Sequence, residues 1–162
     1  MEVVQQTFRN LTLYPLASGL SGTLSTVGLL ASAPVAGGLS WQARVAYAHD
    51  EAQFAFDSYD SFTADVWLPW SVSLPTPWAG TARWTFIPTA GVSTWNYGAP
   101  DPFVAPFTIA HTTEWRAGLG AEVPIWGKLV LGTLLQYRDA ISNVAAFSYR
   151  DLAISAGPMI RF

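Results

Sequence analysis

The stretch Ile109–Val123 reads IAHTTEWRAGLGAEV, and its residues alternate between two kinds. The odd positions are mostly apolar and include Trp115, Leu119 and Val123, whereas the even positions from Thr112 onward carry polar, charged or glycine residues. A period of two over this length is typical of a β-strand with one apolar and one polar face. Ile109–Val123 is therefore predicted to be a long, half-buried strand.

The same period recurs on both sides of this stretch. It is clear in five further segments: Leu39–Ala48, Phe62–Trp70, Ala82–Thr94 with Pro88 as an irregularity, Lys128–Arg138 and Asp151–Phe162. Two segments with poorer alternation, Glu2–Tyr14 and Gly22–Ser32, are predicted as the first two strands. Since no segment has a helical period, the pattern predicts one all-β domain over residues 1–162, with about eight antiparallel strands.

The connections between these strands alternate in length. Short or proline-containing links are Ala33–Ala36, Ser71–Ala79 and Pro124–Gly127, and longer links are His49–Tyr59, Asn96–Pro106 and Asp139–Phe147. This alternation predicts an up-and-down arrangement with turns at one end and loops at the other. An even number of strands places both termini at the turn end.

Composition excludes several classes of protein. Of 162 residues, 51% are hydrophobic and only 12% are charged, while the net charge of −3 and the lack of a basic run argue against a nucleic-acid partner. The absence of cysteine excludes disulfides and thiolate chemistry. The uncharged stretch Asn10–Ala43 contains Pro15 and Pro34 and does not fit a membrane-spanning helix. Ala31–Ala33 resembles the cleavage site of a signal peptide, but a signal peptide is a less favoured interpretation of this stretch.

The two faces of the predicted strands differ in their content of charged residues. Those in links, at strand ends or near the N-terminus are Glu2, Arg9, Asp50, Glu51, Asp57, Asp60, Asp101, Asp139 and Arg150. The others lie on the polar phase: Arg44, Asp65, Arg83, Glu114, Arg116, Glu122, Lys128, Arg138, Asp151 and Arg161. A basic side chain facing lipid near the bilayer midplane costs roughly 2–4 kcal/mol. An apolar face cleared of charge therefore indicates a transmembrane β-barrel with its polar face inside.

Aromatic and small residues support the same orientation. The aromatics assigned to the apolar phase near strand ends are Trp41, Tyr47, Trp70, Trp84, Trp95, Trp115 and Tyr137, which suits rings at the headgroup level. The small residues of the polar phase are Ala46, Ala48, Gly118, Gly120, Gly132, Ala153 and Gly157. Small side chains inside a narrow barrel leave room for the charged ones.

The chain ends in GPMIRF, with Phe162 last and apolar residues at every second position before it. This ending resembles the closing strand of small bacterial outer-membrane β-barrel proteins. The resemblance implies location in the bacterial outer membrane and recognition of the last strand by the barrel-insertion machinery. Pro158 departs from the pattern and predicts an irregular bond there, because proline lacks a ladder donor. A soluble lipocalin-like or avidin-like barrel is the main rival.

Candidate chemistry is sparse. His49 and His111 have no metal-ligand spacing. Some eight-stranded outer-membrane barrels deacylate lipid A from an outward Ser–His–acid site, but His111 is followed on its face by Thr113, a poor nucleophile without special activation. An interfacial ring is the favoured role of His111. No catalytic, cofactor-binding or metal-binding residue is therefore predicted, and the protein is expected not to be an enzyme.

The inward carboxylates Glu114 and Glu122 are candidates for acid–base work. They are more simply structural partners of Arg83, Lys128 or Arg138, and the inward Arg116 is expected to pair with Glu114 or Glu122. The acidic residues outside the clear strands are candidates for divalent cations near lipopolysaccharide phosphates, or form a plain solvated surface: Asp50, Glu51, Asp57, Asp60, Asp101 and Asp139.

The function expected from these features is that of a membrane anchor, structural or interaction protein with a side-chain-filled lumen. Its partners would be outer-membrane lipids, the insertion machinery during assembly and a protein at the outer loops. The alternative is a narrow pore or the C-terminal part of a larger transport barrel. A lipid-modifying enzyme and a soluble ligand-binding barrel are less favoured.

Overall fold

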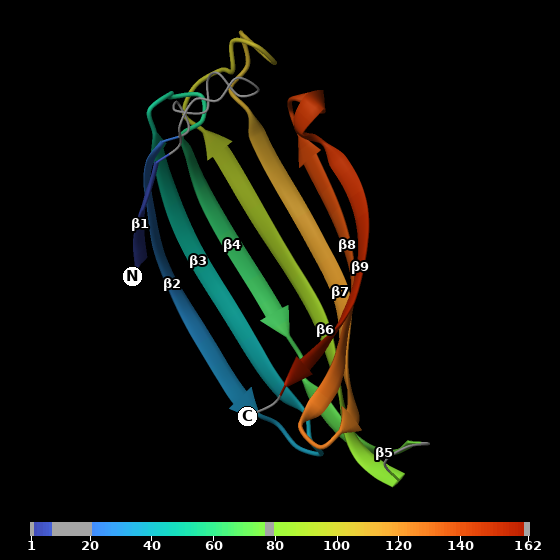
Figure 1. Cartoon of the computed structure of the whole chain (residues 1–162). Coiled ribbons are helices and arrows are strands. Elements are labelled where there is room, and N and C mark those ends of the chain that lie inside the picture. Colours follow the sequence, from blue (N-terminus) through green and yellow to red (C-terminus); the bar gives the residue numbers. More distant parts are fainter. Residues whose placement is uncertain (1, 8–20, 77–79, 161–162) are drawn as a thin grey trace.

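The computed structural model describes residues 2–7, 21–76 and 80–160. They form one antiparallel sheet (Figure 1) with the strands β1 (Glu2–Gln6), β2 (Gly22–Pro34), β3 (Ser40–Ala52), β4 (Tyr59–Trp67), β5 (Trp70–Thr76), β6 (Gly80–Tyr97), β7 (His111–Trp126), β8 (Leu129–Ser142) and β9 (Tyr149–Ile160). A single 3-10 turn, Ala145–Phe147, interrupts the link from β8 to β9. Within the described ranges no helix has the length and apolar character of a membrane-spanning helix. The all-β prediction is confirmed.

The strands follow one another in space almost as they do in the chain. The order across the sheet is β1-β2-β3-β4-β6-β7-β8-β9, and β5 pairs with β6 alone. Trp67 lies opposite Thr89 and Trp70 lies opposite Phe86, so β4 and β5 share one register along β6. They are two halves of one strand that is broken at Leu68–Pro69, where proline supplies no ladder donor. The path therefore has eight positions, as predicted.

Several predicted details are wrong. Most of the predicted turn Ser71–Ala79 belongs to β5, whose hairpin with β6 extends past the other turns (Figure 1). Lys128 lies in the tight turn after Gly127, whose φ of +57° favours glycine, and not on a strand. The register shows no shift at Pro158, because β9 is an edge strand and tolerates proline; the shift falls between Pro124 and Trp126.

Some predictions fall outside the described residues. These are the strand assignment for residues 8–14, part of the link at residues 77–79, and the roles given to Arg9, Arg161 and Phe162.

The two ends of the sheet differ as predicted. Residues 35–39 and 127–128 form short connections at one end, the turn end. Residues 53–58, 98–110 and 143–148 form the connections at the opposite end, the loop end (Figure 1). Strand β1 runs toward the loop end and β9 runs away from it. The sheet thus has the meander topology of an up-and-down fold.

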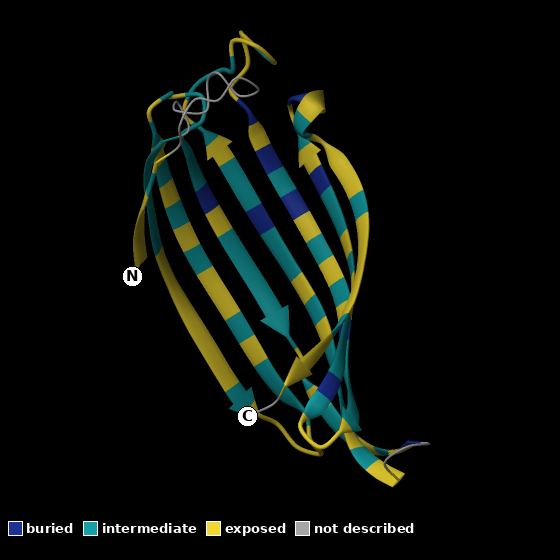
Figure 2. Cartoon of the chain, viewed as in Figure 1, coloured by how far each residue is buried: buried dark blue, intermediate teal, exposed yellow. Residues whose placement is uncertain are grey.

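The sheet is curled but is not closed by hydrogen bonds among the described residues, so β1 and β9 are its edges (Figure 1). Trp67 of β4 and Met159 of β9 line one cavity although their strands are not neighbours. We call the concave side that carries these residues the inner face and the convex side the outer face. Residues along β3 and β7 alternate in exposure because successive side chains point to opposite faces (Figure 2).

The outer face is apolar over most of its height. Leu29 is 75% exposed and Ile154 is 76% exposed, and both lie on this face. Ionisable side chains on the outer face of the described strands cluster toward the loop end: His49, Glu51, Asp60, His111, Asp139 and Arg150. One predicted aromatic is misplaced: Trp95 lies opposite Ser61 and Thr112 on the inner face. The sequence alternation shows the reason, since Trp95 shares its phase with Gly91 and Ser93.

Candidate functional site

Arg116 of β7 is the centre of a charged network on the inner face. Its Nη2 lies 2.8 Å from Oδ1 of Asp65, and its Nη1 lies 2.7 Å from Oε1 of Glu114 and 2.8 Å from Oγ of Ser93. Arg44 of β3 donates to the other oxygen of Asp65 at 2.7 Å. Two arginines and two carboxylates therefore neutralise one another across β3, β4 and β7.

Strand register explains how these residues meet. Asp65, Gly91 and Arg116 lie in one row across β4, β6 and β7. A Cβ atom on Gly91 would collide with the Asp65 carboxylate, so the missing side chain opens a path for the guanidinium over β6. The sequence places Gly91 on the polar phase but gives no sign that it separates the two charged partners.

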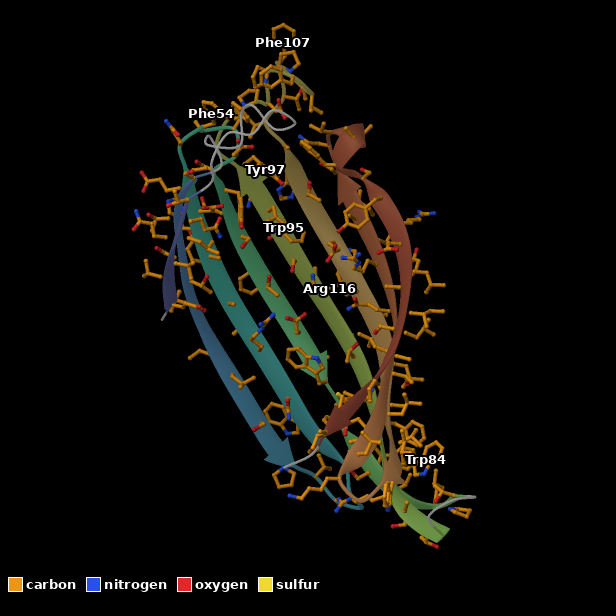
Figure 3. All side chains as sticks on the ribbon, viewed as in Figure 1. Phe54, Trp84, Trp95, Tyr97, Phe107 and Arg116 are labelled. Atoms are coloured by element: carbon orange, nitrogen blue, oxygen red, sulfur yellow. The ribbon has the colours of Figure 1, made fainter. Side chains whose placement is uncertain are left out.

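The network is well removed from solvent at its centre. Glu114 is 4% exposed, whereas the Arg44 side chain is 50% exposed. Glu114 also accepts a hydrogen bond from the Tyr149 hydroxyl of β9. Beside it, Arg138 pairs with Asp151. Arg116 lies part way along the sheet, between the loop-end and turn-end aromatics (Figure 3), so the network spans the middle of the inner face.

The predicted pairing of Arg116 with Glu114 is confirmed, whereas the other predicted partners, Arg83, Lys128 and Arg138, form no ion pair with Glu114 among the described residues. Arg83 lies opposite Ser73 on the projecting hairpin, Lys128 lies in a turn, and Arg138 is paired with Asp151. Sequence spacing could not identify Asp65 or Tyr149, because strand register alone brings them to this site. With both carboxylates held by arginine, the arrangement suits a structural role better than proton transfer.

A cavity of about 520 Å³ lies on the inner face on the turn-end side of the network. Trp67, Ile87, Leu134 and Met159 supply much of its lining, and Glu122 contributes a carboxylate. The predicted small residues do lie on this face, and the glycines among them leave the space: Gly120, Gly132 and Gly157. Side chains thus cross the inner face at Arg116, where a smaller cavity of about 280 Å³ lies beside the network, and the face is more open nearer the turns.

Aromatic side chains gather at the loop end. The rings of Phe54 and Phe56 stack with centroids 5.1 Å apart, and those of Tyr97 and Phe147 with centroids 5.7 Å apart. Phe107 is 96% exposed at the tip of the β6–β7 loop (Figure 3). The loop end of the molecule therefore exposes apolar side chains.

The acidic residues considered as cation ligands do not converge on one point. Asp101 accepts hydrogen bonds from the backbone N–H groups of its own loop, and Asp139 contacts Arg150. Burial and the neighbouring charges of Asp101 and Asp50 raise the pKa of Asp57. Among the residues that the structure covers, no group of three or more potential ligands is arranged to hold a metal ion.

His111 begins β7 on the outer face. Its ring Nδ1 contacts the Asn96 side chain, and its backbone N–H donates to Oδ1 of Asn143 at 2.7 Å. Asn96 of β6 and Asn143, the first residue after β8, therefore both present side-chain amide groups to His111. Neither amide is a nucleophile, so this arrangement does not assemble the hydrolase site that was considered for His111 and Thr113.

Comparison with known proteins gives no further guidance. No protein family, no curated protein and no solved structure matches the chain. The features of the molecule that bear on function are therefore the two faces of the sheet and the side chains that register brings together.

Proposed function

We propose that the chain forms a small transmembrane β-barrel of the bacterial outer membrane, serving as an anchor or interaction protein. The observation that carries this proposal is the division of the sheet into an exposed, uncharged outer band and an inner face with paired charges. A water-soluble barrel keeps its apolar face inside, whereas the apolar face here is on the convex side. Lipid tails are the partner that such a band fits.

Closure of the sheet follows from the same proposal. Unpaired backbone groups cost several kcal/mol each in the hydrocarbon region, so membrane-spanning sheets close on themselves. Strands β1 and β9 run in opposite directions and can therefore close the sheet as an antiparallel pair. The barrel would then have eight positions, with the Arg116 network filling its lumen.

Cysteine labelling tests which face meets lipid. We expect single cysteines at Leu131, Leu135, Ile154 and Ile160 to react with a membrane-confined reagent. Their neighbours Gly132, Gln136 and Ser155 lie on the inner face and provide matched controls. Labelling of the controls in place of the first set would reverse the assignment of the faces and refute the barrel proposal.

A second candidate is a wider transport barrel that needs further strands. The observation in its favour is that β1 pairs only with Gly22–Thr26, so the described structure leaves Val27–Pro34 of β2 without a partner on that side. Strands from a second copy or from additional chain would continue the sheet there. Such a barrel would enclose a wider lumen, and the Arg116 network would line its wall and not block it.

Cross-linking separates the two candidates. With one cysteine at Val3 and a second in turn at Leu152, Ile154 or Ile160, a single closed chain should give an intramolecular cross-link and a monomeric mass in detergent. It should also give no conductance in planar bilayers. Intermolecular cross-links with ion conductance would favour the wider barrel.

Two partners complete the proposal. The insertion machinery would recognise the closing strand during assembly, as the ending of the sequence implies. A protein partner would meet the loop end, where Phe103, Val104 and Phe107 are exposed.

A further inference from the structure

A serine, a histidine and an aspartate lie in one row across three neighbouring strands of the outer face. Ser25 of β2 is directly opposite His49 of β3, and His49 is directly opposite Asp60 of β4. Directly opposed residues on one face of an antiparallel pair have Cβ atoms about 4.5–5.5 Å apart. Ser25 and Asp60 therefore flank His49 on its two sides, although the three residues are distant in sequence.

Hydrogen bonds already orient two of the three. Nδ1 of His49 lies 2.8 Å from Oδ1 of Asp60, and the Tyr47 hydroxyl donates to the same oxygen at 2.5 Å. With its proton on Nδ1 toward Asp60, the imidazole keeps Nε2 as its basic nitrogen. An aspartate that holds a histidine in this tautomer forms the histidine–acid half of a catalytic triad, and Ser25, opposite His49 in register, supplies a hydroxyl on its other side. Both His49 and Asp60 are about half exposed, so the row is open to a substrate.

We propose that Ser25, His49 and Asp60 form an esterase site for membrane lipids. Ser25 Oγ attacks the ester carbonyl carbon while His49 Nε2 takes the serine proton. The carbon–oxygen ester bond then breaks, the alcohol leaves with the proton from His49, and an acyl-serine remains. Water, deprotonated by His49, attacks the acyl-serine and releases the fatty acid, so one ester and one water give one acid and one alcohol. Asp60 acts as a positioning residue.

The position of Ser25, His49 and Asp60 on the outer face indicates the class of substrate. On the turn-end side, the same strands and face carry Val27, Leu29, Val45 and Phe62, whereas Glu51 lies on the loop-end side. The row thus lies where the apolar band gives way to polar residues. The ester groups of a lipid lie between its acyl chains and its headgroup, at the corresponding boundary of the bilayer. The inference rests on the proposed membrane placement and adds an activity to it.

His111 provides an internal contrast. It lies on the same face at the loop end, but its neighbours are Asn96, directly opposite it on β6, and Asn143, just beyond the end of β8. An esterase site at His49 therefore predicts that only one of the two histidines matters for hydrolysis.

The test measures fatty-acid release from phospholipid by the folded full chain in mixed micelles. Ser25→Ala and His49→Phe should each lower the rate by about 10⁶-fold, which leaves no detectable hydrolysis. Asp60→Asn should lower kcat by about 10⁴-fold while KM changes less than about twofold. Thr23→Ala, on the same strand and face as Ser25, and His111→Phe should keep the full rate.

A covalent reagent gives a readout independent of turnover. An alkyl fluorophosphonate should form a phosphorus–oxygen bond at Ser25 with loss of fluoride, detectable by peptide mass, and His49→Phe should prevent it. Absence of both hydrolysis and labelling in folded protein that passes the lipid-facing cysteine test would overturn the esterase but leave the barrel proposal intact. Undiminished hydrolysis by Ser25→Ala would also overturn it. Reversed cysteine labelling would instead refute the membrane placement.

Discussion

Replacing Arg116 with leucine should lower the free energy of unfolding by about 3–5 kcal/mol, the usual cost of breaking one side of a buried ion pair. The guanidinium contacts Asp65, Glu114 and Ser93 at once, and Glu114 is nearly inaccessible to solvent. Loss of Arg116 leaves Glu114 with the Tyr149 hydroxyl and only the more distant charge of Arg138, which is itself paired with Asp151, whereas Asp65 keeps Arg44. Urea unfolding in detergent, followed by tryptophan fluorescence, measures the change.

Two comparisons isolate the cause. The double change Arg116→Leu with Glu114→Leu should recover part of the loss, because it removes the carboxylate left without its arginine. Arg150→Leu is the matched control: Arg150 is largely exposed and contacts Asp139 at 3.3 Å, and an exposed pair of this kind contributes about 0–1 kcal/mol. An unchanged unfolding midpoint for Arg116→Leu would mean a wide, hydrated lumen and would favour the pore over the anchor.

The period of two was sufficient to predict most strands and the inner and outer faces. It worked best in β7, where polar, charged or glycine residues hold the inner face from Thr112 to Glu122. It failed at Ser71–Thr76, where two nearby prolines, Pro75 and Pro77, suggested a turn although serine and apolar residues still alternated. Periodicity describes one strand at a time. The pattern therefore could not distinguish a strand that is interrupted at Pro69 and continues as β5 from a true reversal of the chain.

Contacts between strands could not be predicted from the sequence. Asp65 and Arg116 meet across Gly91, and Ser25, His49 and Asp60 form a row, only because of register. Register depends on the exact lengths of the turns, and a shift of one residue would move every side chain to the other face. The single-strand pattern drew attention to His111, yet the histidine with a serine and an acid beside it is His49.

The second large effect concerns the outer face. Leu135→Arg should lower the free energy of unfolding in phospholipid vesicles by about 2–4 kcal/mol, the cost of a basic side chain near the bilayer midplane. Leu135 lies in the middle of β8 between Leu119 and Ile154, and all three are exposed. A charge placed there would have to leave lipid or draw water and headgroups inward.

A second position on the same strand, at a different depth in the proposed membrane, provides the control. Ile141 is on the same face of β8 as Leu135, six residues nearer the loop end, or roughly 20 Å along the strand. Ile141→Arg should cost only about 0–1 kcal/mol, because the penalty falls toward the interface. In water the two changes would be equivalent surface substitutions within about 0.5 kcal/mol of neutral. Equal, small effects at both positions would therefore place the outer face in water, whereas a cost that grows with distance from the loop end requires a surrounding hydrocarbon layer.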